Sequence, residues 1–226
     1  MNIITMASRK GGAGKSTLTA HLASFCHQAG NRCVVIDADP QGSVTLWHSL
    51  RADGQPPMRS GARGIERVLA SAMVEGYDWA FIDTAGSMWV VAQEAIRAAT
   101  LVLIPARPGF FDLNAVRETV AAARERNKPY AVVLNAAPPK RGDKESPVVA
   151  QSRAFLDKLS IPVWAGQISH RAGFVQTLAG GGSVCETAHD AAATAEMARL
   201  WSALEKSIAA IIDARALANA AQGRAA

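Results

Sequence analysis

A short glycine-rich string near the start of the chain has the composition of a phosphate-binding loop. It follows an apolar run, precedes a helical pattern, and comprises Lys10, Gly11, Gly12, Ala13, Gly14, Lys15, Ser16 and Thr17. Glycines let the backbone curl until successive N–H groups point at phosphate oxygens, and the following helix adds its positive end. Lys15 is expected to reach the β- and γ-phosphates of a nucleotide, and the Ser16 hydroxyl to bind Mg²⁺. The spacing and the flanking elements disfavour the alternative, a glycine-rich turn with an incidental lysine.

The entrance of this loop departs from the ordinary GxxxxGK(S/T) pattern. Arg9 stands where that pattern has glycine, and Lys10 is an additional lysine. The string resembles the deviant Walker A motif, KGGxGK(S/T), of the ParA/MinD/ArsA/nitrogenase-iron-protein class of ATPases. The resemblance implies a catalytic Lys15 and a Lys10 that reaches the ATP of the other subunit in a homodimer, where it would neutralise charge on the transferred phosphoryl group. The alternative for Lys10 is a solvated charge at the edge of a loop.

Two carboxylates follow the second apolar run. Asp37 and Asp39 lie one residue apart after residues 33–36, at what would be the carboxyl end of a parallel strand, where ligands bind in such sheets. One carboxylate could join the Mg²⁺ shell while the other orients the attacking water. The segment looks like the DxDPQ segment of ParA-type ATPases, which implies that Asp39 is the hydrolytic residue. A capped turn after a strand is the alternative.

Polar residues also end the later apolar runs. Asp83 closes residues 79–82 as in a Walker B element and is expected to reach Mg²⁺ through water; where the class commonly has DxPP, this chain has DTAG. Asn135 ends another run, and the resemblance implies that its amide pairs with an adenine edge, although asparagine is also a common turn residue. The string Ile104-Pro105-Ala106-Arg107-Pro108, followed by Phe110-Phe111-Asp112-Leu113, resembles the segment that faces the P-loop in small plasmid partition ATPases. Asp112 itself is interpreted as the N-cap of the next helix. The expected Mg²⁺ ligands are therefore Ser16, Asp37, Asp39 and Asp83.

Apolar runs rich in β-branched residues alternate with helical patterns along most of the chain. Strands are expected over residues 3–7, 33–36, 79–82, 101–104 and 130–134, with a weak one at 161–165, and helices over 16–29, 65–73, 90–99, 113–126 and 188–220. This alternation predicts an α/β fold with a doubly wound, mostly parallel sheet flanked by helices. Residues 52–64 and 138–147 are expected loops, too short to link domains, so residues 1–226 are expected to form one P-loop ATPase domain.

Composition restricts the setting of the protein. The three cysteines are an odd number without a CxxC pair, so neither a disulfide framework nor a zinc site is indicated, and a reducing cytoplasm fits best. Neither a secretion signal nor an apolar run of about 18 residues is found, so export and membrane spanning are not expected. A net charge of +5 favours polyanionic partners, with an ordinary solvated basic surface as an equal alternative.

The resemblance covers nearly the whole chain and is nearest to short, ParF-like plasmid partition proteins. It implies an ATP-dependent homodimer that binds nonspecific DNA, associates with the nucleoid in the cytoplasm, and is released by hydrolysis that a small centromere-binding, ParB-like partner stimulates. Because the first strand is expected at residue 3, the N-terminal helix-turn-helix extension of longer relatives is expected to be absent. Residues 214–226 carry too little apolar area to anchor the protein to a membrane surface.

The DNA contacts and the cargo remain open at this stage. Arg153, Lys158 and Arg171 are candidate DNA contacts, with a second cluster of Lys140, Arg141 and Lys144. Each cluster is equally well explained as an ordinary charged face. The same switch could position a protein cargo through an adaptor, such as a chemoreceptor cluster, a pilus, a relaxosome or a carboxysome-like body. A metabolic ligase or kinase on the same fold is a further alternative, which would need no Lys10 in trans.

Overall fold

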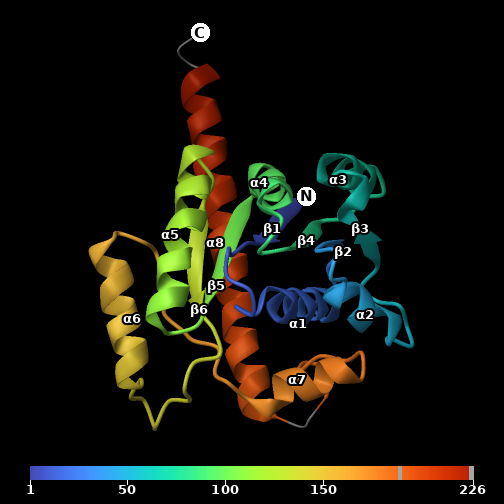
Figure 1. Ribbon diagram of the computed structural model, residues 1–226. Helices are drawn as coiled ribbons and strands as arrows, with labels where there is room; N and C mark the ends of the chain where they lie inside the picture. The colour runs from blue at the N-terminus through green and yellow to red at the C-terminus, as the bar shows by residue number, and fades with distance from the viewer. Residues whose placement is uncertain (188–189, 224–226) are drawn as a thin grey trace.

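The protein is built around one parallel sheet whose strand order places the first strand near its middle. The computed structural model describes residues 1–187 and 190–223, and within them six strands lie in the order β3-β2-β4-β1-β5-β6 (Figure 1). Every pairing is parallel, which confirms the expected fold class. The strands are β1 (Asn2–Met6), β2 (Cys33–Ala38), β3 (Met58–Ser60), β4 (Trp79–Thr84), β5 (Leu101–Ala106) and β6 (Tyr130–Leu134).

Helices cover both faces of this sheet (Figure 1). Alternate residues of each strand point to opposite faces; in β4, Phe81 packs with α1 and α8, whereas Ile82 packs with α3 and α4. Strands β2, β4 and β5 are buried along their whole length, as a sheet covered on two faces requires. The helices are α1 (Lys15–Gln28), α2 (Ser43–Ser49), α3 (Ile65–Val74), α4 (Trp89–Ala98), α5 (Phe110–Glu125), α6 (Pro147–Lys158), α7 (Ala172–Ala179) and α8 (Ala191–Gly223), with a 3₁₀ turn η1 at Gly61–Arg63.

The long helix α8 packs along one face of the sheet and extends beyond the body at its C-terminal end (Figure 1). Its apolar stripe forms core, because Trp201 packs on Trp79 and Phe81 with ring centroids 5.1 and 6.4 Å away. Residues 188–189 of the expected helix and residues 224–226 at the end of the segment 214–226 lie outside the described residues. No helix of the described residues is long and apolar enough to cross a membrane.

Several elements differ from the sequence-based expectation. Residues 52–64 contain the edge strand β3 and η1, and the helices α2 and α7 have only seven and eight residues, too few for a helical period to stand out. Residues 161–165 form no strand and contribute one isolated bridge, Val132 with Val163. Asp112 is not an N-cap, because α5 begins at Phe110 with Gly109 in the cap position. The predicted helix over 113–126 was therefore three residues short at its start.

Candidate functional site

The loop between β1 and α1 has the backbone shape that phosphate binding needs. Gly12 and Gly14 have φ angles of 72° and 97°, in the left-handed region that favours glycine. Gly14 is also the N-cap of α1, and no side chain caps the first-turn amides, so these N–H groups stay available to an anion. A side chain at residue 14 would meet the Asn135 amide nitrogen at 2.0 Å. This loop therefore tolerates only glycine at its helix end.

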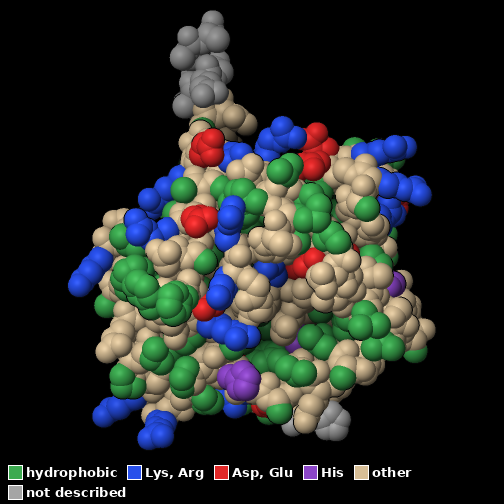
Figure 2. Space-filling view, in the orientation of Figure 1, with side chains coloured by type: hydrophobic (Ala, Val, Ile, Leu, Met, Phe, Trp, Pro, Cys, Tyr) green, Lys and Arg blue, Asp and Glu red, His purple; other side chains and the backbone are tan. Residues whose placement is uncertain are grey.

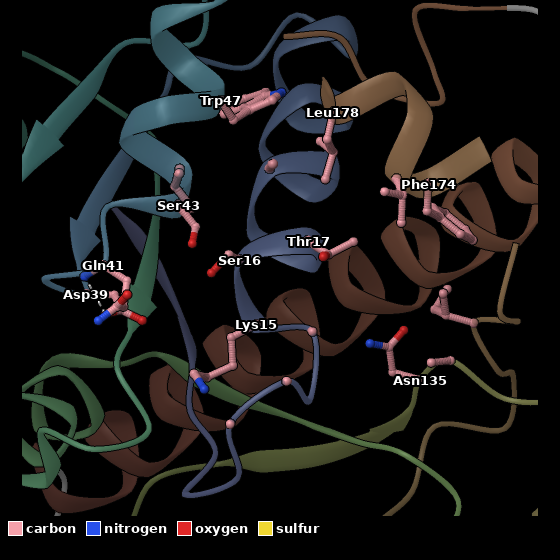
Figure 3. A pocket seen from close by; sticks show the side chains of 18 of the residues that line it. Lys15, Ser16, Thr17, Asp39, Gln41, Ser43, Trp47, Asn135, Phe174 and Leu178 are labelled. Atoms are coloured by element: carbon pink, nitrogen blue, oxygen red, sulfur yellow. Dashed lines mark hydrogen bonds between the residues drawn. The ribbon is translucent and has the colours of Figure 1, made fainter. Parts of the chain in front are cut away.

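The two lysines of the loop have opposite surroundings. Lys15 is buried, and its Nζ donates to the Lys10 carbonyl oxygen at 3.4 Å, so the Lys15 side chain folds back over the loop (Figure 3). Burial lowers the pKa of Lys15, against the raising effect of Asp83 and Asp39. Lys10 is exposed, and none of the described residues accepts a hydrogen bond from its ammonium group. One lysine is thus placed for a ligand in the loop, and the other is free toward solvent.

Ser16 and Asp83 meet at the ends of α1 and β4. The Ser16 hydroxyl donates to Asp83 at 2.6 Å, and the Thr19 hydroxyl donates to its other oxygen at 3.3 Å. Burial raises the pKa of Asp83 to about 7, Ser16 opposes the rise by donating to it, and the nearby Asp37 carboxylate adds to it. Asp37 is the direct register partner of Asp83 on β2. Both predicted carboxylates therefore lie at the same edge of the sheet.

The two aspartates at the carboxyl end of β2 have different tasks. Asp37 is buried and accepts the Thr45 N–H at 2.9 Å and the Thr45 hydroxyl at 2.6 Å, which fixes the first turn of α2. Asp39 lines the cleft beside the loop, where it accepts the Gln41 N–H at 2.9 Å (Figure 3). Thr45 carried no motif signal in the sequence. Of the two, Asp39 is the carboxylate that a ligand in the cleft can meet.

The donor atoms at this edge suit magnesium. Hydroxyl and carboxylate oxygens are the groups that Mg²⁺ prefers, usually with phosphate and water completing its shell. Ser16, Asp39 and Asp83 supply such atoms beside the loop, and the Ser16–Asp83 hydrogen bond marks where the hydroxyl and carboxylate converge. Among the described residues no three His, Cys, Asp or Glu side chains form a metal cluster by themselves. A cation here would thus depend on the phosphates of a nucleotide for much of its coordination.

The opposite flank of the loop is formed by the ends of β5 and β6. The buried Asn135 amide donates to the Ala13 carbonyl at 2.8 Å, so it supports the phosphate loop itself. In Figure 3, Asn135 and Asp39 lie on opposite sides of Lys15. Arg107, which follows β5 and lines the same cleft, has a guanidinium nitrogen 3.5 Å from the point where a Cβ on Gly12 would stand. The resemblance places Arg107 in a segment expected to face the P-loop, but the sequence indicates no role for its side chain.

The loop opens into a large cleft. Its volume is about 1030 Å³, and it continues from the phosphate loop between α2 and α7, which is ample for a nucleotide-sized ligand. The far walls are apolar: Trp47 on α2 faces Phe174 and Leu178 on α7 (Figure 3), and Val44 on α2 also lines this part of the cleft. At the outer rim of the same sheet edge, the exposed Phe110 begins α5, where Figure 2 shows hydrophobic side chains gathering with Lys and Arg side chains beside them.

Residues 4–184 match the family described as the CobQ/CobB/MinD/ParA nucleotide binding domain. The match includes the phosphate loop, Asp39, Asp83 and Asn135. The chain belongs to this family. Among curated proteins, the chain is similar to the chromosome-partitioning ATPase Soj of Thermus thermophilus, with 28% identity over 152 residues that cover 54% of this chain and 61% of Soj. The maintenance of carboxysome distribution protein A of Gloeobacter kilaueensis is 28% identical over 75% of this chain and 88% of its own length.

Several of these relatives are longer than the matched part, since the chain spans 61% of Soj and 51% of the ParA protein of Rhizobium radiobacter, to which it is 34% identical. Solved structures agree on the fold. A variant of Cyanothece McdA in complex with ATP has a TM-score of 0.64 at 19% identity and covers 96% of both chains. MinD of Pyrococcus horikoshii with Mg-ADP has a TM-score of 0.71 at 15% identity and covers 93% of this chain and 98% of its own.

For a ParA/MinD family member, the expected DNA-contacting residues have unexpected surroundings. Arg153 donates to Glu145 at 3.0 Å and to the carbonyls of residues 164 and 166 at 2.7 and 2.6 Å. Arg171 pairs with Glu196 at 3.1 Å. Lys158 is exposed at the end of α6. The guanidinium of Arg153 is therefore occupied in fixing a loop, and of the three only Lys158 combines exposure with no acceptor among the described residues.

Proposed function

We propose that this protein is a ParA-type ATPase that forms a dimer when ATP is bound and returns to the monomer when the ATP is hydrolysed. The observation that carries the proposal is the contrast between the two loop lysines: Lys15 is buried against the loop, whereas Lys10 is exposed and unpartnered among the described residues. An ammonium group at the entrance of the loop has no task within its own subunit. Contact with the terminal phosphate of the nucleotide bound to a second subunit would give it one. Dimerisation would then depend on whether the bound nucleotide is a triphosphate.

The proposed reaction is hydrolysis of ATP to ADP and phosphate. Asp39 orients a water that attacks the γ-phosphorus, the bond from that phosphorus to the β,γ-bridging oxygen breaks, and ADP leaves with inorganic phosphate. Lys15 and the partner's lysine stabilise the charge that moves onto the phosphoryl oxygens and the leaving group. Ser16, Asp39 and Asp83 would hold Mg²⁺, which supplies further charge neutralisation when bound. The first-turn amides of α1 hold the phosphate chain in place.

The ATP-bound dimer is proposed to bind nonspecific DNA of the nucleoid. A small centromere-binding protein is the proposed partner that stimulates ATP hydrolysis and so releases the ATPase from DNA. Two relatives, Soj of Thermus thermophilus and ParA of Caulobacter vibrioides, are named as chromosome-partitioning proteins, and these names together with the net charge of +5 support this cargo class. Positioning of a protein cargo is the second candidate. It is favoured by the carboxysome distribution protein, which this chain matches over 88% of that protein's length.

Light scattering with Mg·ATP, Mg·ADP and no nucleotide tests the switch. Asp39→Ala is expected to bind ATP and remain dimeric, because the water is no longer oriented, while wild-type protein returns to monomer as ATP is consumed. Lys10→Ala is expected to stay monomeric in all three conditions. Lys206→Ala, which removes an exposed lysine from α8, should behave as wild type. A monomeric Asp39→Ala protein with bound Mg·ATP contradicts the proposed mechanism.

A further inference from the structure

Arg107 stands at a fixed point beside the phosphate loop. It directly follows β5, the neighbour of β1 in the sheet, and the preceding carbonyl of Ala106 accepts the Asn135 N–H at 2.9 Å. Prolines on both sides of the Ala106–Arg107 pair restrict its backbone. The side chain is exposed within the cleft, and its guanidinium carbon and Nη2 lie 3.9 and 3.5 Å from where a Cβ on Gly12 would be. The absent side chain of Gly12 thus leaves the guanidinium next to the loop backbone.

Arg107 differs from the other cations that line this cleft. Arg9 pairs with Glu118 at 3.0 Å and lies over the Trp89 ring at 4.9 Å, and Arg171 pairs with Glu196. Among the described residues, none accepts a hydrogen bond or forms an ion pair with Arg107. A guanidinium group presents five donors in a fixed planar fork that matches carboxylate or phosphate geometry. Its donors are therefore available to an anion in the cleft.

The two flanks of the loop have opposite charge. Asp37, Asp39 and Asp83 all lie on the flank of β2 and β4, which suits a metal ion. On the flank of β5, Arg107 is the nearest charged side chain to Gly12 among the described residues. A triphosphate lying in the loop would meet a cation-binding edge on one side and a guanidinium on the other.

The position along the loop indicates which phosphate Arg107 faces. The inner phosphates are expected at the first turn of α1, where the uncapped amides lie. Lys15, which reaches toward the β- and γ-phosphates in such loops, turns back to the Lys10 carbonyl at 3.4 Å. The terminal phosphate is therefore expected at the first half of the loop, between Lys10 and Gly12. Arg107 adjoins that half.

We infer that Arg107 is a nucleotide-binding residue that contacts the terminal phosphate of ATP bound in its own subunit, from the flank opposite Asp39. The contact favours triphosphate over diphosphate, so this side chain helps the loop to distinguish the two nucleotide states. The inference rests on the proposed nucleotide-binding function and names a further residue for it.

Calorimetric titration with Mg·ATPγS and Mg·ADP tests the contact. Arg107→Ala is expected to weaken ATPγS binding by about tenfold or more, as for loss of a hydrogen bond to a charged group, and to leave ADP binding unchanged within error. Arg107→Lys should retain part of the preference, since it keeps the charge without the planar fork. Arg117→Ala, which removes an exposed arginine of α5 that does not line the cleft, serves as the control. Equal losses for both nucleotides, or none, overturn the inference.

The same titration in a Lys10→Ala background separates the two subunits. Without the lysine that is proposed to act in trans, binding reports on a single subunit, and the Arg107 effect is expected to persist. Loss of the effect in that background overturns the contact within one subunit. A variant that binds ATPγS normally but binds DNA more weakly would show a DNA contact instead and also overturn it. Failure of wild-type protein to bind ATPγS would refute the proposed function, whereas normal binding by Arg107→Ala alone refutes only this inference.

Discussion

Two groups of basic side chains differ in what surrounds them. The clamped arginines, Arg51, Arg153 and Arg171, each donate to a glutamate, and the first two also donate to backbone carbonyls. The phosphate edge, Lys10 and Arg107, has no acceptor for its side-chain nitrogens among the described residues. The same chemical group thus fixes a chain segment in one place and stays available to an anion in the other. A neighbouring carboxylate decides which, and net charge alone does not reveal it.

The largest expected effect comes from removing Lys15, the buried lysine of the same phosphate loop as Lys10. Lys15→Ala is expected to lower ATP hydrolysis by about a thousandfold, the effect of deleting one group that stabilises a developing oxyanion. Burial lowers the pKa of Lys15, because a charged group loses solvation when it is buried. The charged side chain therefore does not stabilise the fold, and the melting temperature of Lys15→Ala should not fall. Phosphate release and calorimetry measure the two quantities. A variant that loses activity only because it unfolds would place Lys15 with the clamped arginines.

A buried histidine extends the comparison to a basic group that carries no charge. His21 on α1 contacts the Phe174 carbonyl at 3.1 Å, accepts the Val184 N–H at 3.4 Å, and joins α1 to α7 and the segment after it. Burial lowers its pKa to about 4. The unfolded chain binds a proton below about pH 6.5, whereas the folded protein does not until about pH 4. Stability is therefore full above pH 6.5 and is expected to fall by about 3 kcal/mol as pH drops to 4.

Urea unfolding from pH 7.5 to 4 measures this loss. His21→Gln lacks the titrating ring and should show a shallower pH dependence, although it is less stable at neutral pH. Substitution of the exposed His170 by Gln is the matched control and should keep the wild-type profile. A wild-type profile that stays flat between pH 6.5 and 4 would mean that the ring is protonated in the folded protein.

Arg51 tests the clamped group directly. Its side chain is 4% exposed, donates to Glu186 at 2.6 Å and to the carbonyl of residue 181 at 2.8 Å, and lies over Trp47. Arg51→Ala leaves partly buried acceptors without a donor and is expected to cost about 2 kcal/mol of unfolding free energy. Arg97→Ala breaks an exposed pair with Glu66 and should cost less than about 1 kcal/mol. Similar losses in urea denaturation would remove the distinction drawn from burial.

Much of the sheet was predictable because it is buried on both faces. Five of the six strands were found as continuous apolar runs, and the edge strand β3, with only three residues, gave no such run. The meeting of Ser16 with Asp83 also followed from the rule that parallel strands end at a common edge. In both cases local sequence pattern was enough.

Partners distant in sequence were not predictable. Glu186 lies 135 residues after Arg51, and Glu196 lies 25 after Arg171, so no local pattern marks either arginine as occupied. Arg107, which adjoins Gly12, was assigned no role for the same reason. Thr45 lies only eight residues from Asp37, but no known motif marks it as the residue that fixes this carboxylate. The sequence therefore indicates which residues can carry charge, while the fold determines which charges remain free.

The smallest expected effect concerns DNA binding, and it compares one of the clamped arginines with an exposed lysine on the same helix. Lys158 is exposed at the end of α6, whereas Arg153 on the same helix is occupied by Glu145 and two carbonyls. If this face binds DNA, Lys158→Ala should make the plot of the logarithm of the DNA-binding constant against the logarithm of salt concentration less steep. The magnitude of the slope should fall by about 0.9, the value for one phosphate contact. Arg153→Ala should leave that slope unchanged and lower the melting temperature instead. An unchanged slope for Lys158→Ala together with a reduced one for Arg153→Ala would show that the clamp opens to reach DNA, and the comparison drawn from its hydrogen bonds would fail.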